Sequence, residues 1–168
     1  MYIMLSFKKA GTNDIPLIRE LTFQIWPVTY KSILSPQQME YMLERMYSVP
    51  SLEHQMRTLE HRFIIGYYME EPAAFASYSP QSREAGIYRL HKIYILPSMQ
   101  GKGAGREIIN HITDEILQDG ATILELNVNR FNNAKSFYEK MGFEVYRTED
   151  KDIGNGYFMN DYVMRRQL

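Results

Sequence analysis

A glycine-dense segment at residues 94–106 carries the clearest chemistry in this sequence. It reads YILPSMQGKGAGR, so an apolar stretch ends at Pro97 and a turn with three glycines follows. Glycine has no Cβ, which lets the backbone open and bring its N–H groups close to an anion. The isoleucine-rich stretch that follows predicts an amphipathic helix, whose positive end points at the same place. The segment predicts a phosphate-binding turn, to which Lys102 and Arg106 add charge.

Two common phosphate motifs do not fit this turn. A dinucleotide fingerprint that starts at Gly101 and Gly103 needs a third glycine three places on, where the chain has Arg106. A Walker loop needs a serine or threonine after its lysine, and Lys102 is followed by Gly103. The failed spacings disfavour a nucleotide-binding module.

The spacing that does fit is Gln-x-x-Gly-x-Gly, from Gln100 to Gly105, directly after a strand that ends in proline. It resembles the acyl-CoA pyrophosphate loop of the GCN5-related N-acetyltransferase (GNAT) superfamily. Taken alone, such a loop also fits a simple tight connection between a strand and a helix.

A second motif follows at residues 126–143, which read LNVNRFNNAKSFYEKMGF. It resembles the second signature of the same superfamily, where a strand leads through asparagines into a short helix with Phe-Tyr that ends at Gly-Phe. The resemblance spans residues 87–143, with both motifs in the family's order. One departure is that Asn132 lies two residues before Ala134, where the family commonly has three, so the asparagine that contacts the cofactor stays open.

The resemblance implies acetyl-CoA as acyl donor and acyl transfer to an amine. It implies that backbone N–H groups of the strand at 87–96, by count those of Ile93 and Ile95, bind the acetyl carbonyl, while the glycine turn holds the pyrophosphate. The cofactor-binding residues expected on this basis are Ile93, Tyr94, Ile95, Gln100, Gly101, Lys102, Gly103, Ala104, Gly105, Arg106, Asn132 and Tyr138.

Two side chains are candidates for proton transfer. The family's Phe-Tyr motif places Tyr138 near the CoA sulfur. A phenol with a pKa near ~10 is a weaker acid than a thiol near ~8.5, so full protonation of the thiolate is uphill by about 2 kcal/mol. Tyr138 therefore fits a hydrogen-bond donor as well as an acid, and a packing residue is the third alternative. His91 is the candidate base, since an imidazole with a pKa near ~6.5 suits neutral pH. The alternative for His91 is a half-buried packing residue, in which case water or an already partly neutral amine would serve.

The first third of the chain offers candidates for the acceptor site. Trp26, Tyr30 and Tyr47, with Glu44, form an aromatic and acidic set that fits a cationic amine. Helical aromatic residues also fit a hydrophobic core, and that alternative stays open. Asp152 and Asp161 near the C-terminus are equally open candidates.

Composition bounds the class of protein. With 168 residues, the chain is long enough for one domain with a sizeable core, and we expect a single N-acetyltransferase domain over 1–168. A net charge of −1 without blocks of like charge gives no footprint for nucleic acid. No apolar run approaches the ~20 residues of a membrane span. The first seven residues indicate a strand and not a signal peptide, so we expect a cytoplasmic protein.

Metal and thiol chemistry are not expected either. The chain has no cysteine and four scattered histidines, without the spacing of a metal site. The expected partner is a small-molecule or peptide amine, and a homodimer is left open.

Periodicity predicts a helical first third and a strand-rich remainder. Helices are predicted at 15–26, where Pro27 would end the first, at 35–46, and at 51–59 with Ser51 as cap. Strands are predicted at 63–69, 73–79, 87–96, 121–128, 143–147 and 157–165, with a further helix at 132–141. The predicted fold is α+β, a GNAT-like mixed, mostly antiparallel central sheet of about seven strands flanked by helices.

The sequence thus predicts an acetyl-CoA-dependent N-acetyltransferase. It would move an acetyl group to a primary amine of a small molecule, of which a polyamine is one candidate, or of a peptide, by direct attack on the thioester. The alternative is a catalytically idle acyl-CoA-binding regulatory protein on the same fold.

Overall fold

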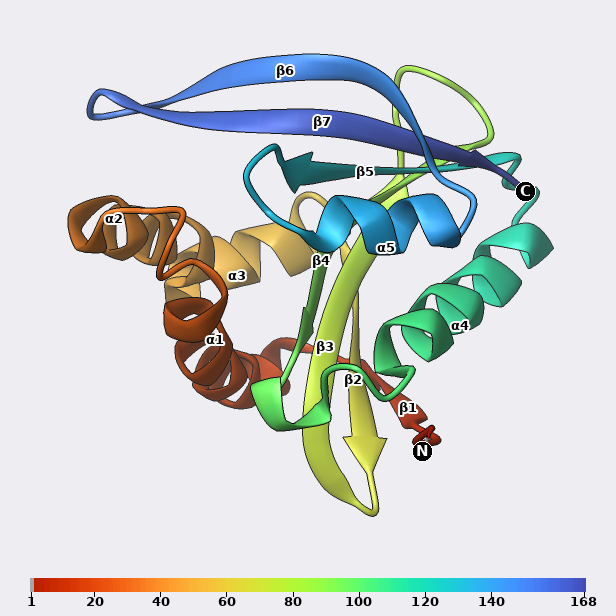
Figure 1. Cartoon of the computed structure of the whole chain (residues 1–168). Coiled ribbons are helices and arrows are strands. Elements are labelled where there is room, and N and C mark those ends of the chain that lie inside the picture. Colours follow the sequence, from red (N-terminus) through yellow and green to blue (C-terminus); the bar gives the residue numbers. More distant parts are fainter. Residues whose placement is uncertain (1) are drawn as a thin grey trace. The chain divides into compact units, whose positions relative to one another are not determined.

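One mixed sheet contains the seven strands found in residues 2–168, which the computed structural model describes (Figure 1). The strands are β1 (Ser6–Ala10), β2 (Arg62–Tyr68), β3 (Glu71–Pro80), β4 (Ile87–Ile95), β5 (Ile123–Asn129), β6 (Glu144–Gly154) and β7 (Tyr157–Gln167). Their order is β1-β2-β3-β4-β5-β7-β6. The β4–β5 pair is parallel, whereas the β1–β2, β2–β3, β5–β7 and β6–β7 pairs are antiparallel. The predicted sheet is confirmed.

Five α-helices accompany the strands in the described residues. They are α1 (Ile15–Thr29), α2 (Pro36–Tyr47), α3 (Val49–Arg57), α4 (Ala104–Gln118) and α5 (Ala134–Lys140), with short 3-10 helices at Thr12–Asp14 and Pro97–Met99. The chain divides into two units. The first runs to Ser79 and includes Lys92–His111, and the second contains Pro80–His91 and Ile112–Leu168. Because β4 and α4 each contribute to both units, a single domain stays our prediction.

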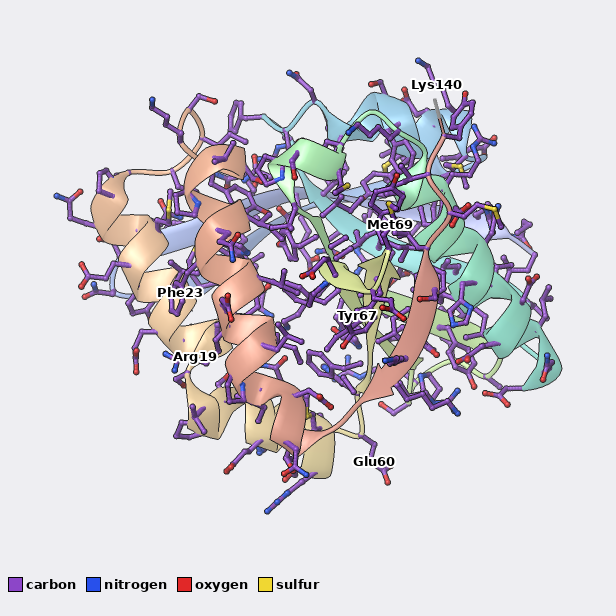
Figure 2. The ribbon with its side chains drawn as sticks, turned by 90° about the horizontal axis from the view of Figure 1, so that it is seen from below. Arg19, Phe23, Glu60, Tyr67, Met69 and Lys140 are labelled. Atoms are coloured by element: carbon purple, nitrogen blue, oxygen red, sulfur yellow. The ribbon has the colours of Figure 1, made fainter. Side chains whose placement is uncertain are left out.

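The first unit holds α1, α2 and α3 together, beside β2 and β3 (Figure 1). Ser35 caps α2 by accepting a hydrogen bond from the Gln38 amide at 3.1 Å, as the sequence predicted. Figure 2 shows Arg19 and Phe23 on one face of α1, where the guanidinium lies 5.4 Å from the ring centroid. Arg19 Nε also donates to the Tyr47 carbonyl at 2.9 Å, which ties α1 to the end of α2.

Three predicted element boundaries in this unit were wrong. Helix α1 continues through Pro27 to Thr29, because a proline in the last turn removes only one helical hydrogen bond. The cap of α3 is Ser48, whose hydroxyl accepts from the Ser51 amide at 3.3 Å, so the helix starts earlier than predicted. The first strand begins at Ser6, and residues 2–5 precede it as irregular chain.

The second unit contains β5, the long β6–β7 hairpin and α5. Glu125 on β5 is only 3% exposed and forms ion pairs with Arg89 and with Arg165, whose Nε lies 2.7 Å from the carboxylate. Two cations compensate the burial of this carboxylate. The sequence predicted only 143–147 for β6, which extends to Gly154. Most of its residues are exposed, so the strand lacks the period-two pattern that would announce it.

Candidate functional site

The glycine turn connects β4 to α4 inside the first unit. Gly101 and Gly103 have φ angles of +74° and +86°, which residues with a Cβ rarely adopt. A Cβ built on Gly101 would meet nothing within 4 Å, so its backbone faces open space. The sequence prediction of left-handed glycines at this turn is confirmed at these two positions.

The backbone amides at the start of α4 complete the turn. The Glu107 amide donates to the Gly103 carbonyl at 3.1 Å, which is the first hydrogen bond of the helical pattern. The amides of residues 104–106 therefore precede the helical bonding and have no carbonyl four residues back within the helix. With Lys102 and Arg106 in the same segment, this group of donors suits an anion.

The backbone of β4 has one edge committed to β3 in this unit. The Leu96 amide donates to the Ala73 carbonyl at 2.9 Å. Successive amides of a strand alternate between its two edges, so the Ile95 amide, which directly precedes Leu96, points away from β3. On that edge, the Gln100 side-chain amide donates to the Ile95 carbonyl at 3.1 Å.

The parallel ladder of β4 with β5 lies in the second unit. It runs from the pair Ile87 and Ile123 to the pair Leu90 and Leu126. His91 is the next residue of β4 and is half-buried.

The second motif forms the turn between β5 and α5. Asn129 Oδ1 accepts from the Phe131 amide and Asn132 Oδ1 accepts from the Ala134 amide, each at 2.9 Å. Both asparagines therefore fix the entry to α5. On α5, Tyr138 is 8% exposed, and burial raises its pKa well above the ordinary value of a phenol.

Comparison with known proteins decides the family. Residues 30–165, more than half of the chain, match the family model described as the acetyltransferase (GNAT) domain. This chain belongs to the GNAT acetyltransferases.

Individual members of the family resemble the chain to different extents. An uncharacterised N-acetyltransferase of Mycobacterium tuberculosis is 36% identical over 80 residues, which cover 47% of this chain and 51% of that protein. The match thus spans about half of that relative's length. The spermidine N(1)-acetyltransferase of Thermoplasma acidophilum is 24% identical over 154 residues, 89% of this chain and 94% of that enzyme.

Solved structures confirm the GNAT fold. The PaiA N-acetyltransferase of Thermoplasma acidophilum, in complex with coenzyme A, superposes with a TM-score of 0.81 and 22% identity. The alignment covers 99% of this chain and all 100% of that one.

The GNAT chain gathers most of the predicted acceptor residues in its first unit. Trp26 lies 4.6 Å from Tyr30 and 5.4 Å from Tyr47, measured between ring centroids. The hydroxyls of Tyr30 and Tyr94 are 3.0 Å apart. Trp26 and Tyr47 are only 1% and 0% exposed, so they belong to the core. Both rings pack against Tyr94, which is half-buried like Tyr30. Glu44 lies on an exposed position of α2 instead.

A polar group in the second unit includes one of the two predicted aspartates. Asp161 and Glu149 accept hydrogen bonds from the same side-chain amide, Asn127 Nδ2, at 3.2 and 3.1 Å. Burial, with Glu149 nearby, raises the pKa of Asp161. Asp152 instead accepts from the Gly154 amide at 2.8 Å and fixes the hairpin turn.

Lys92 is a buried cation that sequence reasoning missed. Its Nζ donates to Gln55 Oε1 at 2.7 Å and lies 5.3 Å from the ring centroid of Tyr47. Gln55 is held in place by its own donation to the Met46 carbonyl at 2.8 Å. Burial lowers the pKa of Lys92 to about 8, and burial together with Lys92 lowers that of His61 to about 4. A lone lysine in a strand gives no signal in the sequence that neighbouring elements will cover it.

Metal and membrane features are not found among residues 2–168. That part of the chain has no cluster of three or more metal-binding side chains, and none of its helices could span a membrane.

The burial of Lys92 predicts a pH-dependent stability. The ordinary pKa of a lysine is 10.5, and the folded value is about 8, so the unfolded chain binds the extra proton between these values. The free energy of unfolding therefore rises with pH across this window, by roughly 3 kcal/mol from this residue alone. Denaturation of the natural protein and of Lys92→Met from pH 7 to 10.5 measures it as the difference between the two curves. Lys31→Met, at an exposed position, is the control, and parallel curves for Lys92→Met would contradict the prediction.

Proposed function

We propose that this protein is an acetyl-CoA-dependent N-acetyltransferase that acts on a primary amine of a small molecule. The observation that carries the proposal is the arrangement of β4 and the glycine turn. A strand end whose Ile95 amide points away from β3 leads within a few residues into a turn with two left-handed glycines and a helix start. Together they provide a line of backbone donors.

The turn fits the pyrophosphate of the acyl donor. Gly101 offers open space where any other residue would place a Cβ, and the amides of 104–106 precede the helical hydrogen bonds. Lys102 and Arg106 add positive charge around these donors. In this proposal, residues 100–106 hold the cofactor mainly through backbone N–H donors.

The amides of Ile93 and Ile95 are suited to the thioester carbonyl. Acetyl-CoA supplies an activated acyl group, and the attacking amine places negative charge on the carbonyl oxygen. One preorganised donor to such an oxygen contributes about 2.7–4 kcal/mol to the transition state. In this proposal, the Gln100 side chain donates a hydrogen bond to the Ile95 carbonyl, and the Ile95 amide is left for the ligand.

Tyr138 fits a hydrogen-bond donor to the departing thiolate better than a full acid. Its raised pKa makes proton release harder than for an ordinary phenol. The buried ring lies against Phe137 and Phe143, with centroid distances of 5.3 and 5.8 Å, so the hydroxyl is held in one place. A fixed donor stabilises the thiolate without transferring its proton.

The proton of the amine has two candidate acceptors in the second unit. His91 is half-buried on β4 and keeps its predicted role as base. Asp161 competes with it, because a carboxylate with a raised pKa binds a proton more readily than an exposed one. The two candidate bases, His91 and Asp161, predict that the reaction rate falls at different pH values on the acidic side.

A cationic acceptor such as a polyamine is favoured by two observations. In the first unit, the half-buried rings of Tyr30 and Tyr94 offer π faces to an ammonium group. The spermidine acetyltransferase of Thermoplasma acidophilum, similar over 89% of this chain, supports the same class.

A panel of amines with detection of free CoA thiol tests the proposal. We expect spermidine to be acetylated faster than an alanyl peptide, because its ammonium groups suit the π faces of Tyr30 and Tyr94. A quaternary amine of similar size is the control, since it cannot accept an acyl group. Binding of acetyl-CoA without thiol release for any amine would support the idle regulatory protein instead.

Tyr138→Phe is predicted to lower kcat and to leave acetyl-CoA affinity nearly unchanged. The ring still packs, and only a hydrogen bond to a charged group is lost, which is worth about 1.5–3 kcal/mol, or roughly 10- to 100-fold in rate. Steady-state kinetics together with calorimetry measure both quantities. The exposed Tyr146→Phe serves as control. An unchanged kcat would leave Tyr138 with a packing role only.

A further inference from the structure

The irregular segment before β1 runs along the glycine turn within the first unit. The Ile3 amide donates to the Lys102 carbonyl at 3.0 Å, and the Leu5 amide donates to Glu107 Oε2 at 2.6 Å. These two hydrogen bonds from backbone amides fix the segment against the glycine turn and the first turn of α4.

The anchoring continues on both sides of these contacts. Ile3 is 3% exposed, so its side chain is fixed in the core. Phe7 stacks on His111 of α4, with ring centroids 4.3 Å apart and an interplanar angle of 17°. The position of Tyr2 follows from this anchored chain.

The ring of Tyr2 lies directly on the turn. A Cβ built on Gly103 would come within 2.5 Å of Tyr2 Cδ1, which is closer than such atoms approach in proteins. Tyr2 itself is 83% exposed. One part of the ring thus touches Gly103, while most of its surface is open to solvent beside the proposed pyrophosphate site.

We propose that Tyr2 is a cofactor-binding residue whose ring stacks on the adenine base of CoA. The inference rests on the proposed function, because it takes the pyrophosphate to lie on residues 100–106. The adenosine is joined to that pyrophosphate through its ribose, so the base would lie beside the turn. A flat apolar ring held at this place offers the base a stacking surface.

Stacking explains why a large aromatic ring remains exposed at this position. The Tyr2 ring would become buried only when the ligand binds. Every nucleobase has a π face that an aromatic side chain can cover. Such base–aromatic stacking is lost on substitution by alanine with an effect of roughly 5- to 100-fold in affinity. Gly103 has a second reason to be glycine, since any Cβ would displace the Tyr2 ring.

The test measures CoA binding to Tyr2→Ala and Tyr2→Phe by calorimetry, and follows the adenine H2 and H8 resonances by NMR. Met4→Ala is the matched control, because Met4 lies on the same segment and is also 83% exposed. We expect Tyr2→Ala to weaken binding by about tenfold, and Tyr2→Phe and Met4→Ala to bind normally. An upfield ring-current shift of the adenine protons should appear in the natural protein and in Tyr2→Phe, and disappear in Tyr2→Ala.

The outcomes separate this inference from the proposed function. Unchanged affinity of Tyr2→Ala overturns the stacking. Weaker binding with an unchanged adenine shift also overturns it, because the ring would then only support the turn. A natural protein that does not bind CoA at all contradicts the proposed function itself.

Discussion

The alternation of backbone amides along β4 is the constraint on which the proposed chemistry depends. The hydrogen bond from the Leu96 amide to the Ala73 carbonyl commits the end of the strand to β3 and directs the preceding Ile95 amide away from β3. The Gln100 side chain then donates a hydrogen bond to the Ile95 carbonyl. In this account, the rate acceleration comes from backbone N–H groups of β4, which the sheet holds in position. Backbone N–H groups of the glycine turn bind the phosphates in the same way.

Local signals made the turn and the family predictable. Pro97, three alternating glycines and an isoleucine-rich helix are short-range features, and their conformations depend little on distant parts of the chain. The mostly antiparallel sheet of about seven strands follows from the GNAT resemblance. Periodicity alone underestimated β6, because a largely exposed strand shows no apolar alternation, and it ended α1 too early at Pro27.

Tertiary contacts decided what the sequence did not show. Lys92 is buried because α3 and the aromatic residues close over it, with Gln55 as its acceptor. Tyr2 meets Gly103 about a hundred residues later in the chain. Neither contact leaves a pattern in the local sequence. Of the expected acceptor residues, Trp26 packs against Tyr30 and Tyr47, whereas Glu44 lies at an exposed position of α2.

Residue-resolved amide exchange, with and without acetyl-CoA, tests the central claim most directly. If backbone donors hold the cofactor, acetyl-CoA slows exchange at Ile93, Ile95 and residues 101–106. The Leu96 amide, already bonded to Ala73, provides an internal reference and changes little. Binding of acetyl-CoA without added protection at Ile93, Ile95 and the glycine turn would contradict the account.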